Sequence, residues 1–235
     1  MLSRLASLSE NDNPSPVLLT GASGLGQSEI ALQAARNWAS GPVEDYSQLR
    51  VVMGKSSDDL SVRDLRHSLS LKAVGRRAIL LNLTGASLEV QNALLKSLED
   101  TPALTWLLLI AEDGYTVLPT VRSRCAILHF SAWDEQSMSS LAQQESLQGD
   151  LKLAAGNPSC LRWINDHQQI SEAASQGNAS LLLQHLKASE SPAEDLRYIL
   201  NIRRVTNPSW QLSYAQQMLA VGAKPELVLA CALLV

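Results

Sequence analysis

The chain has 235 residues, of which 46% are hydrophobic, and a formal net charge of −4. This length suits one large or two to three small globular domains. The acidic balance excludes an overall basic field that would attract nucleic acid or an anionic membrane. The three cysteines, which are odd in number and far apart, predict neither a disulfide framework nor a zinc site; they are Cys125, Cys160 and Cys231.

Targeting signals are the next feature of the sequence. Residues 1–16 lack the uninterrupted apolar core of a signal peptide. No stretch reaches the ~18–20 apolar residues that are needed to span a bilayer. We therefore expect a soluble, cytoplasmic protein without a membrane partner.

The first half of the chain alternates short apolar runs with helical patterns. The predicted strands are 16–21, 49–54, 77–83, 105–112 and 125–130, and the predicted helices between them are 28–39, 61–74 and 87–100. Strands that alternate with helices of 10–14 residues are typical of a parallel α/β sheet. Apolar runs without polar alternation indicate that both faces of the sheet are covered. The prediction is a parallel five-stranded sheet with helices on both faces.

After Ser131 the character of the sequence changes. No strand-like run recurs, and short helical patterns follow at 134–144, 150–156 and 159–175. Gly177 and Asn178 interrupt this series, and a last all-helical group extends to residue 235. We therefore expect three domains: an α/β domain at 1–131, a small helical domain at 132–176 and a compact helical group at 177–235.

A glycine-rich segment, GASGLGQS, joins the first predicted strand to the first predicted helix. In a P-loop of the pattern G-x-x-x-x-G-K-[ST], backbone N–H groups surround phosphates and the lysine reaches the β- and γ-phosphates. The candidate nucleotide-binding residues are Gly21, Gly24, Gly26, Gln27 and Ser28. Gln27 occupies the lysine position, and a neutral amide does not replace an ammonium opposite polyphosphate. The sequence predicts a degenerate P-loop, and a glycine-rich turn without any ligand is the simpler alternative.

A second loss concerns the end of the third predicted strand. ATPases of this build carry Asp-Glu there, which binds magnesium and activates water, whereas this strand ends with Leu81 and Asn82. An amide does not accept a proton near neutral pH, so Asn82 is no general base. Both losses point to the same inactive pocket.

Two longer motifs are more specific than the glycine loop. They are NALLKSLEDTP at 92–102 and LPTVRSRC at 118–125. With this spacing the chain resembles the AAA+ subunits of sliding-clamp loaders, and among them the delta-prime type. Weaker similarity extends over 61–81, LAAGNPSCL at 153–161 and the last predicted helix.

The resemblance implies an AAA+ P-loop fold at 1–131, followed by a lid domain at 132–176 and a collar domain at 177–235 through which five subunits assemble into an open ring. It implies that Arg124, flanked by Ser123 and Cys125, is an arginine finger that reaches the γ-phosphate bound by a neighbouring subunit. ATP and Mg²⁺ then belong to that neighbour, and this chain needs no cofactor of its own. The implied partners are gamma/tau-like ATPase subunits, a delta-like subunit, and the sliding clamp and primer-template DNA through the complex.

Departures from the ATP-hydrolysing members of the family are consistent with this. The positions of the P-loop lysine, the Asp-Glu pair, the sensor threonine and the lid arginine are occupied by Gln27, Leu81 with Asn82, Ala111 with Glu112, and Ser159 with Cys160. The four-cysteine zinc module common among bacterial relatives is absent from this sequence. The chain is therefore expected to be no enzyme by itself, and the collar is shorter than the family's usual one.

Three alternatives remain at this point. Arg124 can be a loop arginine that pairs with a nearby carboxylate, such as Glu112 or Asp113. The chain can be an active P-loop ATPase or kinase that tolerates Gln27, or an AAA+ adaptor outside replication.

The histidines show no ligand spacing and are interpreted as packing or surface residues; they are His67, His129, His167 and His185.

Overall fold

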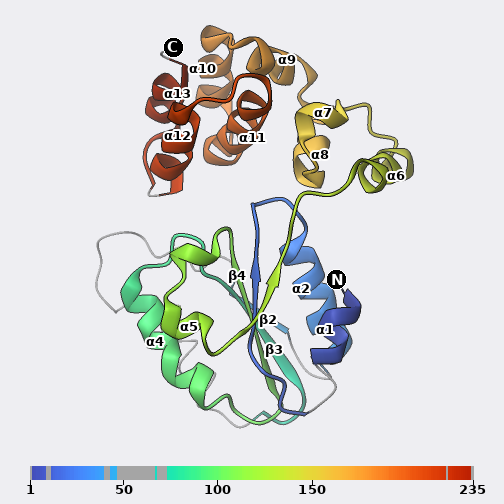
Figure 1. Ribbon diagram of the computed structural model, residues 1–235, viewed down its shortest axis with the longest axis vertical. Helices are drawn as coiled ribbons and strands as arrows, with labels where there is room; N and C mark the ends of the chain where they lie inside the picture. The colour runs from blue at the N-terminus through green and yellow to red at the C-terminus, as the bar shows by residue number, and fades with distance from the viewer. Residues whose placement is uncertain are drawn as a thin grey trace. The chain divides into compact units, whose positions relative to one another are not determined.

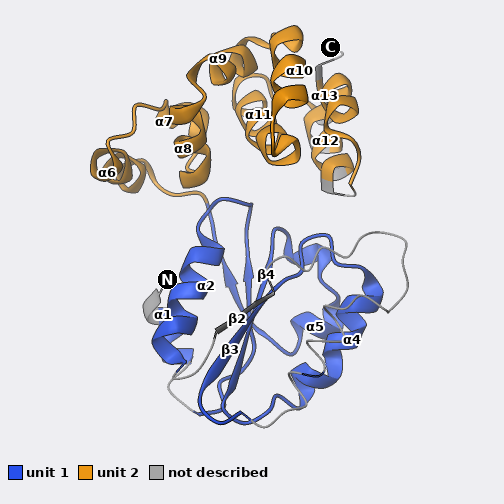
Figure 2. Ribbon diagram, turned by 180° about the vertical axis from the view of Figure 1, so that it is seen from behind, with its two compact units in different colours: residues 1–131 blue, residues 132–235 orange. Residues whose placement is uncertain are grey.

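The chain divides into two compact units, residues 1–131 and 132–235 (Figure 2). The computed structural model describes residues 2–8, 12–39, 43–46, 67, 73–220 and 222–233. The further division of the second unit at residue 177 stays a prediction. Each unit has its own apolar core, and the two are described separately below.

The first unit contains a parallel sheet. Its strands are β1 (Val17–Thr20), β2 (Val43–Tyr46), β3 (Arg77–Asn82), β4 (Thr105–Ala111) and β5 (Ala126–His129). They lie in the order β2-β3-β4-β1-β5, and every pair is parallel. β1 and β4 are buried along their whole length, which explains their continuous apolar sequences.

Four of the predicted strands are found in this sheet, as β1, β3, β4 and β5. The strand β2 has the sequence VEDY, which the sequence analysis did not identify as a strand because two of its four residues are acidic. The predicted strand 49–54 lies outside the described residues, as does most of the predicted helix 61–74.

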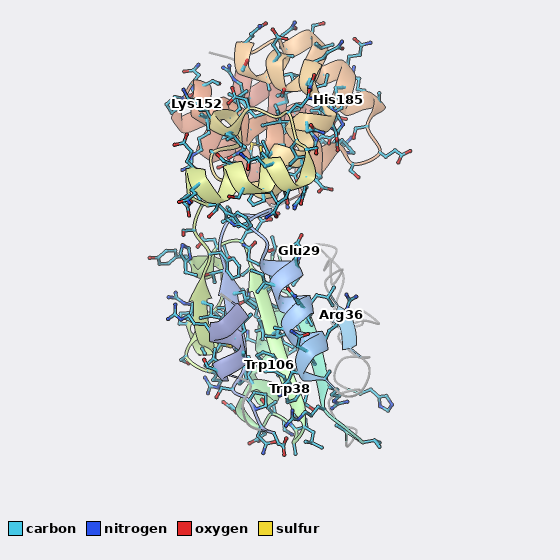
Figure 3. All side chains as sticks on the ribbon, turned by 90° about the vertical axis from the view of Figure 1, so that its right-hand side faces the viewer. Glu29, Arg36, Trp38, Trp106, Lys152 and His185 are labelled. Carbon is cyan, nitrogen blue, oxygen red and sulfur yellow. The ribbon has the colours of Figure 1, made fainter. Side chains whose placement is uncertain are left out.

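Helices cover both faces of this sheet (Figure 1). On one side are α1 (Leu2–Leu8) and α2 (Gln27–Trp38), and on the other are α4 (Leu88–Glu99) and the single turn α5 (Pro119–Arg122), which follows the 3₁₀ turn η1 (Gly114–Thr116). The α4 and α5 side encloses an apolar cluster that includes Leu98, Leu109 and Val121. Trp38 packs edge-on against Trp106 at 5.8 Å between ring centroids, which fixes the end of α2 against β4 (Figure 3).

The second unit is helical throughout its described residues. Its elements are α6 (Glu135–Glu145), α7 (Leu151–Ala154), α8 (Pro158–Asp166), α9 (Gln168–Gln176), α10 (Ala179–Ala188), α11 (Pro192–Thr206), α12 (Trp210–Ala220) and α13 (Pro225–Leu233). One apolar cluster runs through the unit, from Met138 to Ala232. The predicted single helix 159–175 is wrong, because His167 leaves the helical conformation (φ −127°, ψ 50°) and separates α8 from α9. None of the helices in the part of the chain that is described combines the length and apolarity needed to traverse a bilayer.

Candidate nucleotide loop and arginine site

The loop between β1 and α2 has the backbone that its glycines predict. Gly21, Gly24 and Gly26 have φ angles of 148°, 86° and 97°, which side chains of L-residues rarely adopt. A Cβ on Gly21 would lie 2.5 Å from the carbonyl oxygen of Phe130. The turn therefore depends on glycine at this position even without a ligand.

Gln27, at the lysine position, is directed into the loop. Its side chain is buried, and Nε2 donates hydrogen bonds to the carbonyl oxygens of Gly21 at 2.6 Å and Ala22 at 2.9 Å. Ser28 and Glu29 follow it in the first turn of α2 and are exposed; Glu29 lies near the loop end of that helix (Figure 3). A carboxylate here adds negative charge where a P-loop binds phosphate.

The last two residues of β3 carry no acid for metal binding or water activation. Leu81 is 1% exposed and belongs to the core. The Oδ1 atom of Asn82 accepts a hydrogen bond of 2.9 Å from the backbone N–H of Thr84, so its amide shapes the turn.

Ala111, at the sensor position, is fully buried. In the second unit, Cys160 is buried among apolar side chains, and burial raises the pKa of its thiol to about 11.

Arg124 makes contacts within its own chain. Its Nε donates to Oε1 of Glu99 at 3.0 Å, Nη2 contacts the same oxygen, and Nη1 donates to the carbonyl oxygen of Thr120 at 2.8 Å. The ion pair is open to solvent, since the side chains of Arg124 and Glu99 are 33% and 49% exposed. Arg124 is therefore paired with a carboxylate of its own chain, as the loop-arginine alternative expected, but the partner is Glu99 at the end of α4 and not Glu112 or Asp113.

The flanking residues of the S-R-C motif have different surroundings. Ser123 donates from Oγ to the carbonyl oxygen of Thr120, and Nη1 of Arg124 donates to the same Oγ at 3.4 Å. Cys125 packs beside the α4 core cluster, and burial raises the pKa of its thiol to about 11. This thiol is protonated at neutral pH and is no nucleophile. Ser123 thus contacts the guanidinium of Arg124, whereas Cys125 packs against the core.

Arg124 and the glycine loop lie at opposite ends of the parallel strands: Arg124 at their amino-terminal end and the loop at their carboxyl-terminal end. β1 and β5 pair in parallel from Val17 with Ala126 to Thr20 with His129. Arg124 precedes the first of these pairs, whereas Gly21 follows the last. At about 3.3 Å per residue, the two sites are separated by about 13 Å or more along the strands.

A cleft opens beside Arg124, at the amino-terminal end of the strands. Its volume is ≈ 380 Å³, and it is lined by Asn13, Pro14, Ser15, Pro16, Leu98, Glu99, Thr101 and Arg124. The segment before β1 and the end of α4 thus leave the guanidinium accessible from outside the unit.

Comparisons with known proteins identify relatives of this chain. Residues 44–134 match the family described as DNA polymerase III, delta subunit. The DNA polymerase III subunit delta' of Escherichia coli K12 is 33% identical over 129 residues, which are 51% of this chain and 39% of that protein. The resemblance to clamp-loader subunits is confirmed. The chain aligns with well under two thirds of the length of its E. coli relative.

Solved structures show the fold of the chain. A DNA polymerase III, gamma subunit-related protein from Thermotoga maritima superposes with a TM-score of 0.57 at 14% identity, covering 99% of this chain and 97% of that one. A variant of RuvB from T. maritima gives a TM-score of 0.53 at 15% identity, covering 95% of this chain and 81% of that one. The expected α/β fold with a parallel sheet is therefore found, and these two structures share it.

Proposed function

We propose that this chain is a nucleotide-inactive subunit of a sliding-clamp loader in DNA replication, and that it provides Arg124 in trans to the ATP site of a neighbouring ATPase subunit. Its partners are gamma/tau-like ATPase subunits and a delta-like subunit. The sliding clamp and primer-template DNA are reached through the assembled complex, in the cytoplasm. ATP and Mg²⁺ belong to the neighbouring subunit.

The position of Arg124 carries this proposal. Arg124 lies at the amino-terminal end of the strands, and the glycine loop of the same chain lies at the carboxyl-terminal end. The guanidinium therefore does not reach a phosphate bound in that loop. It faces an open cleft and stays ionised at cellular pH. Any triphosphate that Arg124 contacts therefore comes from another chain, which is the arrangement of an arginine finger supplied in trans.

The contacts of Arg124 within its own chain are weak enough for its guanidinium to move to a phosphate of a neighbouring subunit. Exposed ion pairs contribute about 0–1 kcal/mol, so the bond to Glu99 opposes release of the guanidinium only weakly. A bidentate contact with a phosphate is stronger, because the planar fork matches two phosphate oxygens. We infer that Glu99 orients Arg124 in the free chain. When a neighbouring subunit binds, the guanidinium of Arg124 leaves Glu99 and contacts the γ-phosphate instead.

The state of the chain's own loop supports the nucleotide-inactive part of the proposal. The amide of Gln27 is bonded to two loop carbonyls and stands where a P-loop has its lysine. Leu81 is buried and Asn82 is engaged in a turn, so the described end of β3 provides no carboxylate for Mg²⁺. ATP hydrolysis needs both the P-loop lysine and a carboxylate that binds Mg²⁺.

The proposal is tested by replacing Arg124 in a complex reconstituted from this chain and the clamp-loader subunits of its source. We expect Arg124→Ala to leave assembly intact and to lower ATP turnover at the site it serves by about 10²-fold or more. Arg122→Ala is the matched control. Arg122 lies two residues away on α5, with its guanidinium 5.5 Å from the ring centroid of Tyr115, and its loss should leave turnover near normal.

Three results would contradict the proposal in distinguishable ways. Unchanged turnover of an assembled Arg124→Ala complex would exclude the finger, whereas failure of the wild-type chain to join the subunits would favour an AAA+ adaptor outside replication. Equilibrium binding of ATP to the purified chain tests the remaining alternative. Micromolar, Mg²⁺-dependent affinity would show that the loop with Gln27 is an active P-loop.

A further inference from the structure

Two histidines and one aspartate converge within the helical unit. His167 lies at the junction of α8 and α9, His185 in α10 (Figure 3) and Asp195 in α11. One potential ligand atom from each residue lies within 4.8 Å of the other two. The sequence interpretation of these histidines as packing or surface residues missed the cluster, because its members come from separate helices and follow no ligand spacing.

The surroundings of His167 fix which of its ring nitrogens is available. Nδ1 lies 3.1 Å from the carbonyl oxygen of Trp163. A carbonyl only accepts hydrogen bonds, so Nδ1 carries the proton of the neutral ring, and Nε2 keeps a lone pair. The ring also stacks on the indole of Trp163, at 4.7 Å between centroids and 16° between planes. The imidazole is thereby oriented on two sides.

Asp195 is held by several donors. It is 8% exposed, and its Oδ1 accepts a hydrogen bond of 2.8 Å from Nε1 of Trp163. Its Oδ2 accepts from Oγ of Ser189 at 2.6 Å and lies 2.9 Å from Nε2 of His185. Burial by itself would raise the pKa of this carboxyl, but these hydrogen bonds and the His185 charge outweigh it and lower the pKa. The carboxylate is thus positioned by its hydrogen-bond partners before any ligand arrives.

We propose that His167, His185 and Asp195 form a binding site for a divalent transition metal ion, with Zn²⁺ as the ion that fits best. Two imidazoles and one carboxylate are a ligand set that suits zinc, whereas Mg²⁺ and Ca²⁺ prefer oxygen ligands. Zinc–ligand distances of about 2.0–2.2 Å separate two ligands of a tetrahedral ion by about 3.4 Å. The separations in the cluster, from 2.9 Å to at most 4.8 Å, differ from this by a small side-chain rotation.

The outer contacts are those that metal ligands normally have. A metal-bound imidazole usually donates its other N–H to a backbone carbonyl or carboxylate, and a metal-bound carboxylate is itself hydrogen-bonded. His167 has the carbonyl of Trp163, and Asp195 has the indole N–H of Trp163 and the hydroxyl of Ser189. One tryptophan therefore orients two of the three ligands.

Metal binding changes one contact of the cluster. The ion takes the place of the proton between Nε2 of His185 and Oδ2 of Asp195, so the neutral ring of His185 then carries its proton on Nδ1. Three protein ligands leave a fourth tetrahedral position for water. Because the ligands come from the α8–α9 junction, α10 and α11, the ion would join these three parts of the helical unit and stabilise it.

The test is a titration of the chelator-treated, full-length chain with Zn²⁺ at neutral pH. We expect one zinc ion per chain and, at saturating zinc, a rise in Tm of about 5 °C or more for the helical unit. His167→Gln should weaken zinc binding at least about tenfold. The control His129→Gln removes a histidine that lies beside Oγ1 of Thr20 in the other unit, and it should leave zinc affinity unchanged.

A second measurement uses Co²⁺ as a spectroscopic probe. Tetrahedral coordination should give visible absorption bands in the wild-type chain that excess Zn²⁺ removes. Equal zinc affinity of the wild-type chain and His167→Gln, or a wild-type chain without these bands, would overturn the proposal. In that case the cluster is only a hydrogen-bonded staple between helices. The cobalt spectrum needs no substitution, so it decides the question even if His167→Gln fails to fold.

Discussion

Gln27 explains how the glycine loop between β1 and α2 is held in its conformation. An unpaired buried amide is costly, yet both hydrogen bonds from Nε2 of Gln27 go to carbonyl oxygens of the loop itself. The side chain thereby joins the first residues of the loop to the first turn of α2. Gln27 thus stabilises the turn from within the loop.

A substitution at this position tests that account. Gln27→Ala leaves the carbonyl oxygens of Gly21 and Ala22 without their donor, and we expect the free energy of unfolding to fall by about 1–3 kcal/mol. Urea unfolding followed by circular dichroism measures this loss. Ser28→Ala, at the exposed neighbouring position, should change stability by no more than about 0.5 kcal/mol. Equal effects of the two substitutions would show that the amide has no structural role.

At the same scale, the contact that Arg124 makes was not predicted from sequence. The S-R-C motif singled out Arg124, and its role as an arginine finger stays a prediction. Its partner Glu99 was missed, although it belongs to the other recognised motif, NALLKSLEDTP. The contact depends on how α4 packs beside α5, and this packing is not encoded in either motif alone.

Among the elements, apolar runs predicted the strands well where both faces of the sheet are covered. They failed for β2, whose sequence VEDY is half acidic. Helix boundaries inside the second unit depended on tertiary contacts. The break at His167 has neither glycine nor proline, and its ring instead stacks on Trp163 and bonds to the carbonyl of that residue. Local sequence signals therefore gave one helix where packing gives two.

The ion pair between α6 and α8 gives a prediction for an exposed contact of two elements. Glu145 accepts hydrogen bonds from Arg162 at 2.7 and 2.6 Å. These bonds lower the pKa of Glu145 below its ordinary value of 4.5. A lowered pKa means that the contribution to stability is present above pH 4.5 and is lost as the pH falls through the lower, folded-state pKa.

We therefore expect Glu145→Gln to reduce the free energy of unfolding slightly at pH 7, by about 0.5 kcal/mol or less because the pair is exposed. The difference from the wild-type chain should shrink as the pH falls below about 4. Thermal unfolding over a pH series measures it. Glu190→Gln, an exposed residue between α10 and α11, is the control, and a Glu145→Gln effect that persists at low pH would contradict the assignment.

For the whole molecule, the main feature is that the two units have separate cores. The cluster around Leu109 draws only on residues of 1–131, and the cluster from Met138 to Ala232 only on residues of 132–235. The match to the delta-subunit family, at 44–134, lies almost entirely in the first unit.

Separate cores predict that residues 132–235 fold without the rest of the chain. This length is enough for an independent domain, and helical packing with short connections folds readily. We expect the fragment to show a helical circular dichroism spectrum and a single cooperative thermal transition that is also seen in tryptophan fluorescence, because Trp163 is buried in its core. A fragment with helical signal but a broad transition and strong dye binding would be a molten globule. That outcome would show that the helical unit depends on the α/β unit for its packing.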